Sequence, residues 1–325
     1  MSKVVKENLA TALRAIGGTL LVIGLLCSLL ARQVWLADLL INFRVQIVVV
    51  LLVSALLLLF VRSKLASMLM VAGVAWLAWP IVPYLKLPGS GKSIEISADQ
   101  AVYRLMSYNV HVDNTRFSDI ANYIAGAGLD FVLLLETNKQ WSDEMDFELR
   151  DHFPHRFAEP KSNFQGITFF SKHPWKTPPT LIEGLNSPTL SVEIELANGV
   201  LRFVGLHPVP PLRPPLAASR NALLAAVAEQ VGESSSRMPT MVAGDFNATP
   251  WSPCFRDFAK VAGLTDSARG RGLQNTWYRL PILAGGLPID HILTGPGVKV
   301  LTRKIGPPIG SDHRPVIVDF VLGVP

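Results

Sequence analysis

Three long apolar runs open the chain. Residues 15–31, 45–61 and 65–85 contain no Asp, Glu, Lys or Arg. A helix that crosses a bilayer needs about 17–25 apolar residues, so each run is long enough to span. The pattern therefore predicts a membrane anchor at residues 1–85 with three transmembrane helices. The flanking arginines, Arg44 among them, are expected to extend toward the polar interface.

Two other interpretations of these runs are weaker. A signal peptide followed by buried core helices is disfavoured, because further apolar runs stand where a cleavage site and the mature protein would follow. A transport role is disfavoured because the runs contain no charged residue that could line a substrate path.

The pattern changes after the third run. Residues 86–100, with Pro88, Gly89 and Gly91, are expected to form a linker to a second domain at 101–325. Short strand-like runs and helical runs then mix without strict alternation, which favours a layered α/β domain. The strand-like runs are 101–110, 130–135, 166–171, 190–196, 200–206, 239–244, 288–293 and 314–321, and the helical runs are about 117–127, 138–151, 216–231 and 252–262.

Charge also separates the two parts. Residues 1–92 contain nine basic and two acidic residues, whereas the rest contains 21 basic and 23 acidic residues. The net charge of +5 therefore belongs to the N-terminal part. The second domain lacks the overall basic charge typical of nucleic-acid binders, although a local basic patch remains compatible with a near-neutral total.

Composition excludes some protein classes, and loop charge indicates an orientation. A mean hydropathy of +0.33 excludes a disordered chain. Two cysteines, Cys27 and Cys254, exclude a disulfide scaffold or a Cys-rich zinc module. The N-terminus and second loop hold five basic residues, against four in the first loop and the segment after the third run. This excess of one favours a cytoplasmic N-terminus, and three spans would then place the second domain outside the cytoplasm.

Polar side chains stand at the ends of six predicted strands. They are Asn109, Glu136, His207, Asp245 with Asn247, Asp290, and Asp312 with His313. One such residue alone is most simply a turn or cap residue, but six together indicate a site at one end of a sheet. Carboxylates with an Asp–His pair suit Mg²⁺ binding and acid–base chemistry. The motifs of zinc peptidases and serine hydrolases, H-E-x-x-H and G-x-S-x-G, do not occur.

Several short motifs resemble the endonuclease/exonuclease/phosphatase superfamily. They span 101–320 in the superfamily's order, and the most specific are Gly-Asp-Phe-Asn at 244–247 and Gly-Ser-Asp-His-Arg-Pro at 310–315. The others are Ser-Tyr-Asn-Val at 107–110, Leu-Glu-Thr at 135–137, Gly-Ile-Thr at 166–168 with Ser-Lys at 171–172, Leu-His-Pro at 206–208, Thr-Trp at 276–277 and Ile-Asp-His-Ile-Leu at 289–293. The chain is similar to the bacterial membrane-anchored members. The resemblance implies a four-layer sandwich, in which two mixed β-sheets are flanked by helices.

The same resemblance implies a metal site. Glu136 matches the glutamate that binds Mg²⁺, with Mn²⁺ as the other candidate ion. Asn109 matches an asparagine beside metal and phosphate, and Asp312 matches a carboxylate on the metal side.

It also implies five catalytic roles. Asp245 matches the aspartate that orients or deprotonates the attacking water, and Asn247 the asparagine that contacts the scissile phosphate. His313 matches the histidine that stabilises the phosphorane or protonates the leaving group, and Asp290 the aspartate that orients it. His207 matches a second histidine found in deoxyribonuclease- and sphingomyelinase-like members.

We therefore expect a membrane-anchored, Mg²⁺-dependent phosphoesterase in which a water attacks a phosphodiester or phosphomonoester in line. Its substrate is expected to be nucleic acid or a phospholipid headgroup, and the sequence favours neither. Residues 15–85 are expected to contact the lipid bilayer, in a multi-pass location in the bacterial inner membrane, and no protein partner is indicated. The alternative is a catalytically inactive membrane scaffold or receptor, disfavoured because every matched site residue is present.

Overall fold

The computed structural model describes residues 3–86, 100–279 and 285–323. The chain divides into two compact units. A helical unit comprises Met1–Pro83 with the short segments Leu212–Pro214 and Pro250–Pro253, and the remaining residues from Tyr84 onward form a larger α/β unit. Most of the predicted linker, residues 87–99, lies outside the described residues.

The helical unit is built from apolar helices. They are α1 (Lys3–Leu30), α2 (Trp35–Ile41), α3 (Arg44–Phe60) and α4 (Lys64–Ala78), followed by the 3₁₀ turn η1 (Val82–Tyr84). Leu51, Leu58 and Leu77 are fully buried in a cluster formed by α1, α3 and α4. The three longer helices therefore pack against one another through an apolar core.

The prediction of three transmembrane helices was wrong. Within 3–86, 100–279 and 285–323, only α1 is long and apolar enough to cross a membrane alone. α2 and α3 meet that criterion only together and are bent by 65°, and α4 has 15 residues. The third apolar run contains Pro80 and Pro83, which cannot continue a regular helix, so α4 ends at Ala78.

The expectation for Arg44 was also wrong. Its side chain is buried, and the guanidinium donates to the carbonyl of Leu77 at 3.3 Å and to Ser28 Oγ at 2.9 Å. Leu77 lies in the last turn of α4, where carbonyls lack partners within the helix. Arg44 therefore completes the end of a neighbouring helix instead of extending to solvent.

The α/β unit contains two six-stranded sheets among the described residues. The first has the order β11 (Val298–Ile305), β12 (Val316–Leu322), β1 (Tyr103–Asn109), β2 (Phe131–Leu135), β4 (Ile167–Ser171), β3 (His155–Glu159). The second has the order β5 (Trp175–Leu181), β6 (Thr189–Leu196), β7 (Gly199–Leu206), β8 (Thr240–Asp245), β10 (Asp290–Thr294), β9 (Thr265–Asp266). Each sheet is mixed, because β1–β2 and β7–β8 are parallel and the other pairs are antiparallel.

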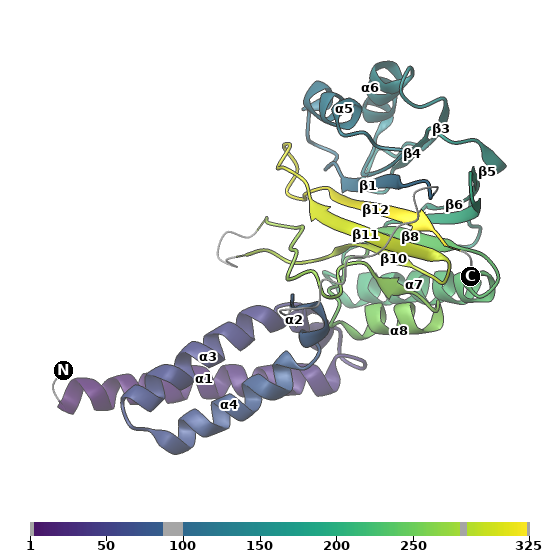
Figure 1. The fold of residues 1–325 in the computed structure, drawn as a ribbon. Helices are drawn as coiled ribbons and strands as arrows, with labels where there is room; N and C mark the ends of the chain where they lie inside the picture. Colours follow the sequence, from purple (N-terminus) through teal and green to yellow (C-terminus); the bar gives the residue numbers. More distant parts are fainter. Residues whose placement is uncertain (1–2, 87–99, 280–284, 324–325) are drawn as a thin grey trace. The chain divides into compact units, whose positions relative to one another are not determined.

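Helices cover the outer face of each sheet (Figure 1). α5 (Phe117–Gly126) and α6 (Lys139–Leu149) pack on the first sheet, and α7 (Pro214–Ser235) and α8 (Pro253–Val261) lie over the second. The alternate side chains of both sheets, such as Leu133 and Phe203, form the core between them. The predicted α/β fold of two mixed sheets flanked by helices is thus confirmed for this unit.

A helix cap next to the expected site gives a first prediction. Asn138 Oδ1 accepts a hydrogen bond from the backbone N–H of Trp141 at 2.9 Å and caps α6. Asn138→Ala is expected to lower the free energy of unfolding by about 1 kcal/mol, because the first turn loses an acceptor. Urea denaturation would measure the change. The exposed neighbour Gln140 provides the control, and an equal effect of Gln140→Ala would contradict the capping role.

Candidate active site

The candidate residues converge because two parallel strand pairs end together. β1 and β2 deliver Asn109 and Glu136 from the first sheet, and β7 and β8 deliver His207 and Asp245 from the second. In α/β folds, side chains at the carboxyl ends of parallel strands line a common edge. Hydrogen bonds and close contacts then connect the two sheets across this edge, as the following distances show.

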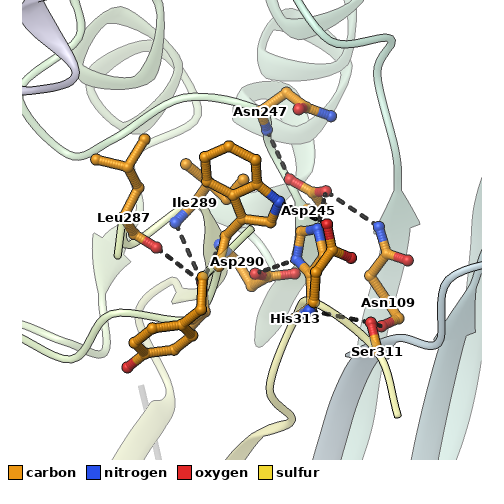
Figure 2. A network of polar contacts seen from close by, with 12 residues as sticks. Asn109, Asp245, Asn247, Leu287, Ile289, Asp290, Ser311 and His313 are labelled. Atoms are coloured by element: carbon orange, nitrogen blue, oxygen red, sulfur yellow. Dashed lines mark hydrogen bonds and ion pairs between the residues drawn. The ribbon is translucent and has the colours of Figure 1, made fainter. Parts of the chain in front are cut away.

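His313 is fixed through both its ring and its backbone (Figure 2). Its Nδ1 lies 2.8 Å from Asp290 Oδ2, and its backbone N–H donates to Ser311 Oγ at 3.0 Å. Ser311 Oγ in turn donates to the carbonyl of Asn109 at 2.8 Å. Thr276 Oγ1 accepts the backbone N–H of Asp290 at 3.1 Å. The Asp290–His313 pair is therefore held from three separate chain segments.

Asp245 lies at the centre of the cluster and is almost fully buried. Its Oδ2 accepts a hydrogen bond from Asn109 Nδ2 at 3.2 Å, and lies 3.5 Å from His207 Nε2 and 3.7 Å from His313 Nε2. Its Oδ1 accepts the backbone N–H of Asn247 at 2.8 Å. One carboxylate thus faces two imidazoles, and the His313 ring lies between two aspartates.

These contacts shift the pKa values of the buried groups. Burial alone would lower the pKa of His313, but Asp290 and Asp245 outweigh it and raise that pKa to about 10. Burial would raise the pKa of Asp245, but His313 and His207 hold it below its ordinary value. Burial would likewise lower the pKa of His207, and its bond to Asp245 raises it instead. At neutral pH the arrangement therefore favours an ionised Asp245 beside a protonated His313.

We expect the charge on His313 to depend on Asp290. Asp290→Asn should lower the pKa of His313, because the nearest carboxylate loses its negative charge. Since the folded-state pKa is raised, the stability that protonated His313 contributes is fully present below about pH 6.5 and is lost as pH rises through about 10. Imidazole ¹⁵N NMR between pH 6 and 11 measures both titrations. Asp319→Asn, which changes a carboxylate bonded to Arg104, is the control, and equal shifts in both variants would contradict the pairing.

Glu136 lies beside this cluster. Its carboxylate accepts hydrogen bonds from Asn109 Nδ2 at 2.9 Å and from the backbone N–H of Val112 at 3.1 Å. Asn109 therefore connects Glu136 to Asp245. Glu136 has φ 64° and Asn247 has φ 49°, in the left-handed region that non-glycine residues rarely occupy. Such conformations persist only where the surroundings fix them, which is common at functional sites.

Three residues that support the site were given no catalytic role by sequence reasoning. Ser311 and Thr276 fix His313 and Asp290, and the buried Arg220 donates to the carbonyl of Asn247 at 3.0 Å. Ser311 had a recognisable signal, because a serine hydroxyl often accepts the backbone N–H of the residue two positions later in a turn, here His313. Thr276 and Arg220 contact residues far along the chain, so local pattern could not assign them.

Asp312 is placed next to the cluster and has other contacts. Its Oδ2 accepts the indole N–H of Trp277 at 3.0 Å and lies 4.0 Å from an amino nitrogen of Arg279. Its Oδ1 is buried and has no hydrogen-bond partner in the described part of the chain. The structure thus brings Asn109, Glu136, His207, Asp245, Asn247, Asp290 and His313 into one network, with Asp312 adjacent in the chain.

Two neighbouring groups could bind a metal. Asp245, Asp290 and His313 offer ligand atoms within 4.8 Å of one another. In that group Asp290 and His313 already bond each other, so a metal would have to compete with that bond. Glu136, with Asn109 and Asp312, provides carboxylate and amide oxygens of the kind that Mg²⁺ prefers. The Asp312 oxygen without a partner fits such an ion, and we favour this second group.

The α/β unit resembles known structures. An endonuclease/exonuclease/phosphatase from Beutenbergia cavernae DSM 12333 is 19% identical over 69% of this chain and 72% of its own, with a TM-score of 0.58. An endonuclease/exonuclease/phosphatase from Bacteroides vulgatus (17%, 69% and 100%, TM-score 0.56) and a humanized D. rerio TDP2 (17%, 67% and 98%, TM-score 0.55) share the fold. No curated protein matches the chain.

A family match extends these similarities to the sequence itself. The Endonuclease/Exonuclease/phosphatase family matches residues 106–313, which is more than half of the chain. The matched region runs from β1 to His313 and includes the network around Asp245. The chain therefore belongs to the Endonuclease/Exonuclease/phosphatase family.

Proposed function

We propose that this protein is a metal-dependent phosphoesterase attached to a membrane by its helical unit. Family membership supports a hydrolase acting on phosphate esters. The observation that most directly supports catalysis is Asp245, which lies 3.5 Å from His207 and 3.7 Å from His313, with Asp290 bound to the far side of His313. Asp245 as proton acceptor and His313 as proton donor would then act within the same buried cluster.

The metal would be bound by Glu136, with Asn109 and Asp312 as further ligands. The donor set consists of oxygens, and Mg²⁺ is our candidate ion, with Mn²⁺ as the other. The ion would neutralise negative charge on the phosphoryl oxygens. Asn109 would position the Glu136 carboxylate, because its amide already donates to that carboxylate.

The remaining residues divide the proton chemistry. Asp245, whose pKa is lowered, would orient the attacking water and accept its proton. His313, protonated at neutral pH and fixed by Asp290, would stabilise the charge that develops on phosphorus and donate its proton to the leaving oxygen. Asn247, whose backbone N–H bonds Asp245, would contact the scissile phosphate.

Exposed apolar side chains support the membrane attachment. α1 is long and apolar enough to span. Large apolar side chains on α1, α3 and α4 point away from their shared core, among them Val22, Leu29, Leu56, Leu59, Leu65, Met68 and Trp76. Contact between these side chains and lipid tails costs no free energy, whereas their exposure to water is unfavourable. This supports a role as anchor for the helical unit.

For the substrate we propose a phosphodiester, with nucleic acid and phospholipid headgroups as the two classes to compare. D. rerio TDP2, 15% identical with a TM-score of 0.56, has been solved in complex with single strand DNA product. The attachment to a bilayer favours a lipid headgroup instead. Neither consideration outweighs the other, so the first assay contains both.

The test is hydrolysis by the detergent-solubilised full chain, with Mg²⁺ or with EDTA. The substrates are bis(p-nitrophenyl) phosphate, single-stranded DNA, RNA and sphingomyelin. We expect turnover that requires Mg²⁺. Glu136→Gln is expected to raise the Mg²⁺ concentration for half-maximal rate by about tenfold or more, because a carboxylate ligand loses its charge.

Glu148→Gln on the exposed face of α6 is the matched control. Hydrolysis that persists unchanged in EDTA would overturn the metal dependence. A folded protein without turnover of any substrate would instead support the scaffold alternative.

A further inference from the structure

A cavity lies in the α/β unit, away from the candidate active site. It has a volume of about 480 Å³ and is bordered by the segments 263–271 and 294–300. Thr294, at the end of β10, lines it, whereas the site residue Asp290 is at the start of that strand. The cavity and the candidate active site are therefore at opposite ends of β10.

Positive charge dominates the lining of the cavity. Arg269, Arg271 and Lys299 contribute three cations, and Asp266 is the one carboxylate among the lining residues. That carboxylate is already engaged, because its Oδ2 lies 3.2 Å from His291 Nδ1 and its Oδ1 accepts the backbone N–H of Ala268 at 2.9 Å. The excess of cations favours an anionic ligand.

Two of the three cations, Arg271 and Arg269, are oriented by contacts with neighbouring residues. Arg271 donates to the carbonyl of Ser267 at 3.0 Å on one side and to that of Val300 at 2.9 Å on the other. The guanidinium of Arg269 lies 5.9 Å from the centre of the Tyr84 ring. A binding site assembled before the ligand arrives loses less conformational entropy on binding.

We propose that this cavity is a binding site for a phosphate group, separate from the candidate active site. A phosphate offers up to two negative charges and several acceptor oxygens, which match three cations better than a single carboxylate does. The group could belong to a lipid headgroup or to a soluble phosphate ester. The proposal does not depend on phosphoester hydrolysis.

The test is calorimetric titration of the detergent-solubilised full chain with inorganic phosphate and with dioctanoyl phosphatidate. EDTA is present throughout, so that a metal cannot recruit either ligand to Glu136. Succinate serves as the carboxylate probe. We expect phosphate or phosphatidate to bind more tightly than succinate.

The variant Arg269→Gln with Lys299→Gln is expected to weaken binding at least about tenfold, because two charge-assisted contacts are lost. The charge-matched control is Arg150→Gln with Lys304→Gln, two exposed cations outside the cavity, which should leave binding unchanged. Hydrolysis by the Arg269→Gln, Lys299→Gln variant should remain at the level of the unmodified chain, which separates this proposal from the proposed function.

The relative affinities of phosphatidate and inorganic phosphate identify the source of the phosphate group. Phosphatidate that binds tenfold tighter than phosphate identifies a lipid headgroup, and equal affinities identify a soluble ester. No binding of either ligand, or equal binding by the cavity variant and its charge-matched control, would overturn the proposal.

Discussion

Replacing His313 with alanine is expected to lower kcat for phosphodiester hydrolysis by about 10²–10⁴-fold, the usual contribution of a positioned acid or base. The expectation rests on position and charge together. The His313 ring lies between Asp290 at 2.8 Å and Asp245 at 3.7 Å, and the two carboxylates raise its pKa to about 10. His313 is therefore protonated at neutral pH, and its Nε2 faces Asp245.

KM should change much less than kcat, because the proton is needed in the transition state and not for binding. His313→Gln is the second variant, since it preserves side-chain bulk and a hydrogen-bonding group beside Asp290. His152→Ala, on the exposed surface, is the control. A His313→Gln variant that remains folded and retains more than a tenth of kcat would contradict the role of His313 as a proton donor.

Sequence reasoning located the central strands and the site residues because both have strong local signals. β1, β2 and β8 are buried on both faces, so they appear as unbroken apolar runs. The polar residue that follows each run is conspicuous, and this is how Glu136 and Asp245 were found before any geometry was known. The roles given to the site residues, including the metal role of Asp312, remain predictions.

The strands that sequence reasoning missed share one physical property. β3 and β11 are the edges of the first sheet, and β5 and β9 are the edges of the second. An edge strand is half exposed and contains polar side chains, so its alternation is weak. β5 also contains Pro178 and Pro179, which are tolerated at a sheet edge and argue against a strand when only the sequence is read.

The membrane segment was misjudged for a different reason. Counting apolar residues measures the length of a run and not the length of a helix. The run 65–85 has 21 residues, but α4 (Lys64–Ala78) has only 15 and ends at Ala78, well before the end of the run. In the same way, a charge at the edge of a run was assumed to face water, although Arg44 is buried against the end of α4. Both errors come from contacts and breaks that hydropathy does not record.

Gly244→Ala is expected to lower the free energy of unfolding by about 3–5 kcal/mol, which is exceptional for the addition of one methyl group. Gly244 pairs with Leu206 in the parallel β7–β8 register and has φ 150°. A Cβ at this position would lie 1.9 Å from the carbonyl oxygen of Leu206. Because that oxygen belongs to the backbone of a central strand, it cannot move aside cheaply.

The same displacement should reach the candidate active site, since Asp245 follows Gly244 and His207 follows Leu206. The urea midpoint of unfolding and kcat should therefore both be lower in Gly244→Ala. The fraction of this variant that folds should also have impaired turnover. Gly126→Ala is the matched control, because a Cβ there meets no atom within 4 Å and Gly126 lies in α5. It should be neutral or slightly stabilising, as alanine favours helix. Equal urea midpoints for the two variants would show that the β7–β8 pair can separate to admit a methyl group, and that the position of Asp245 does not depend on this close strand contact.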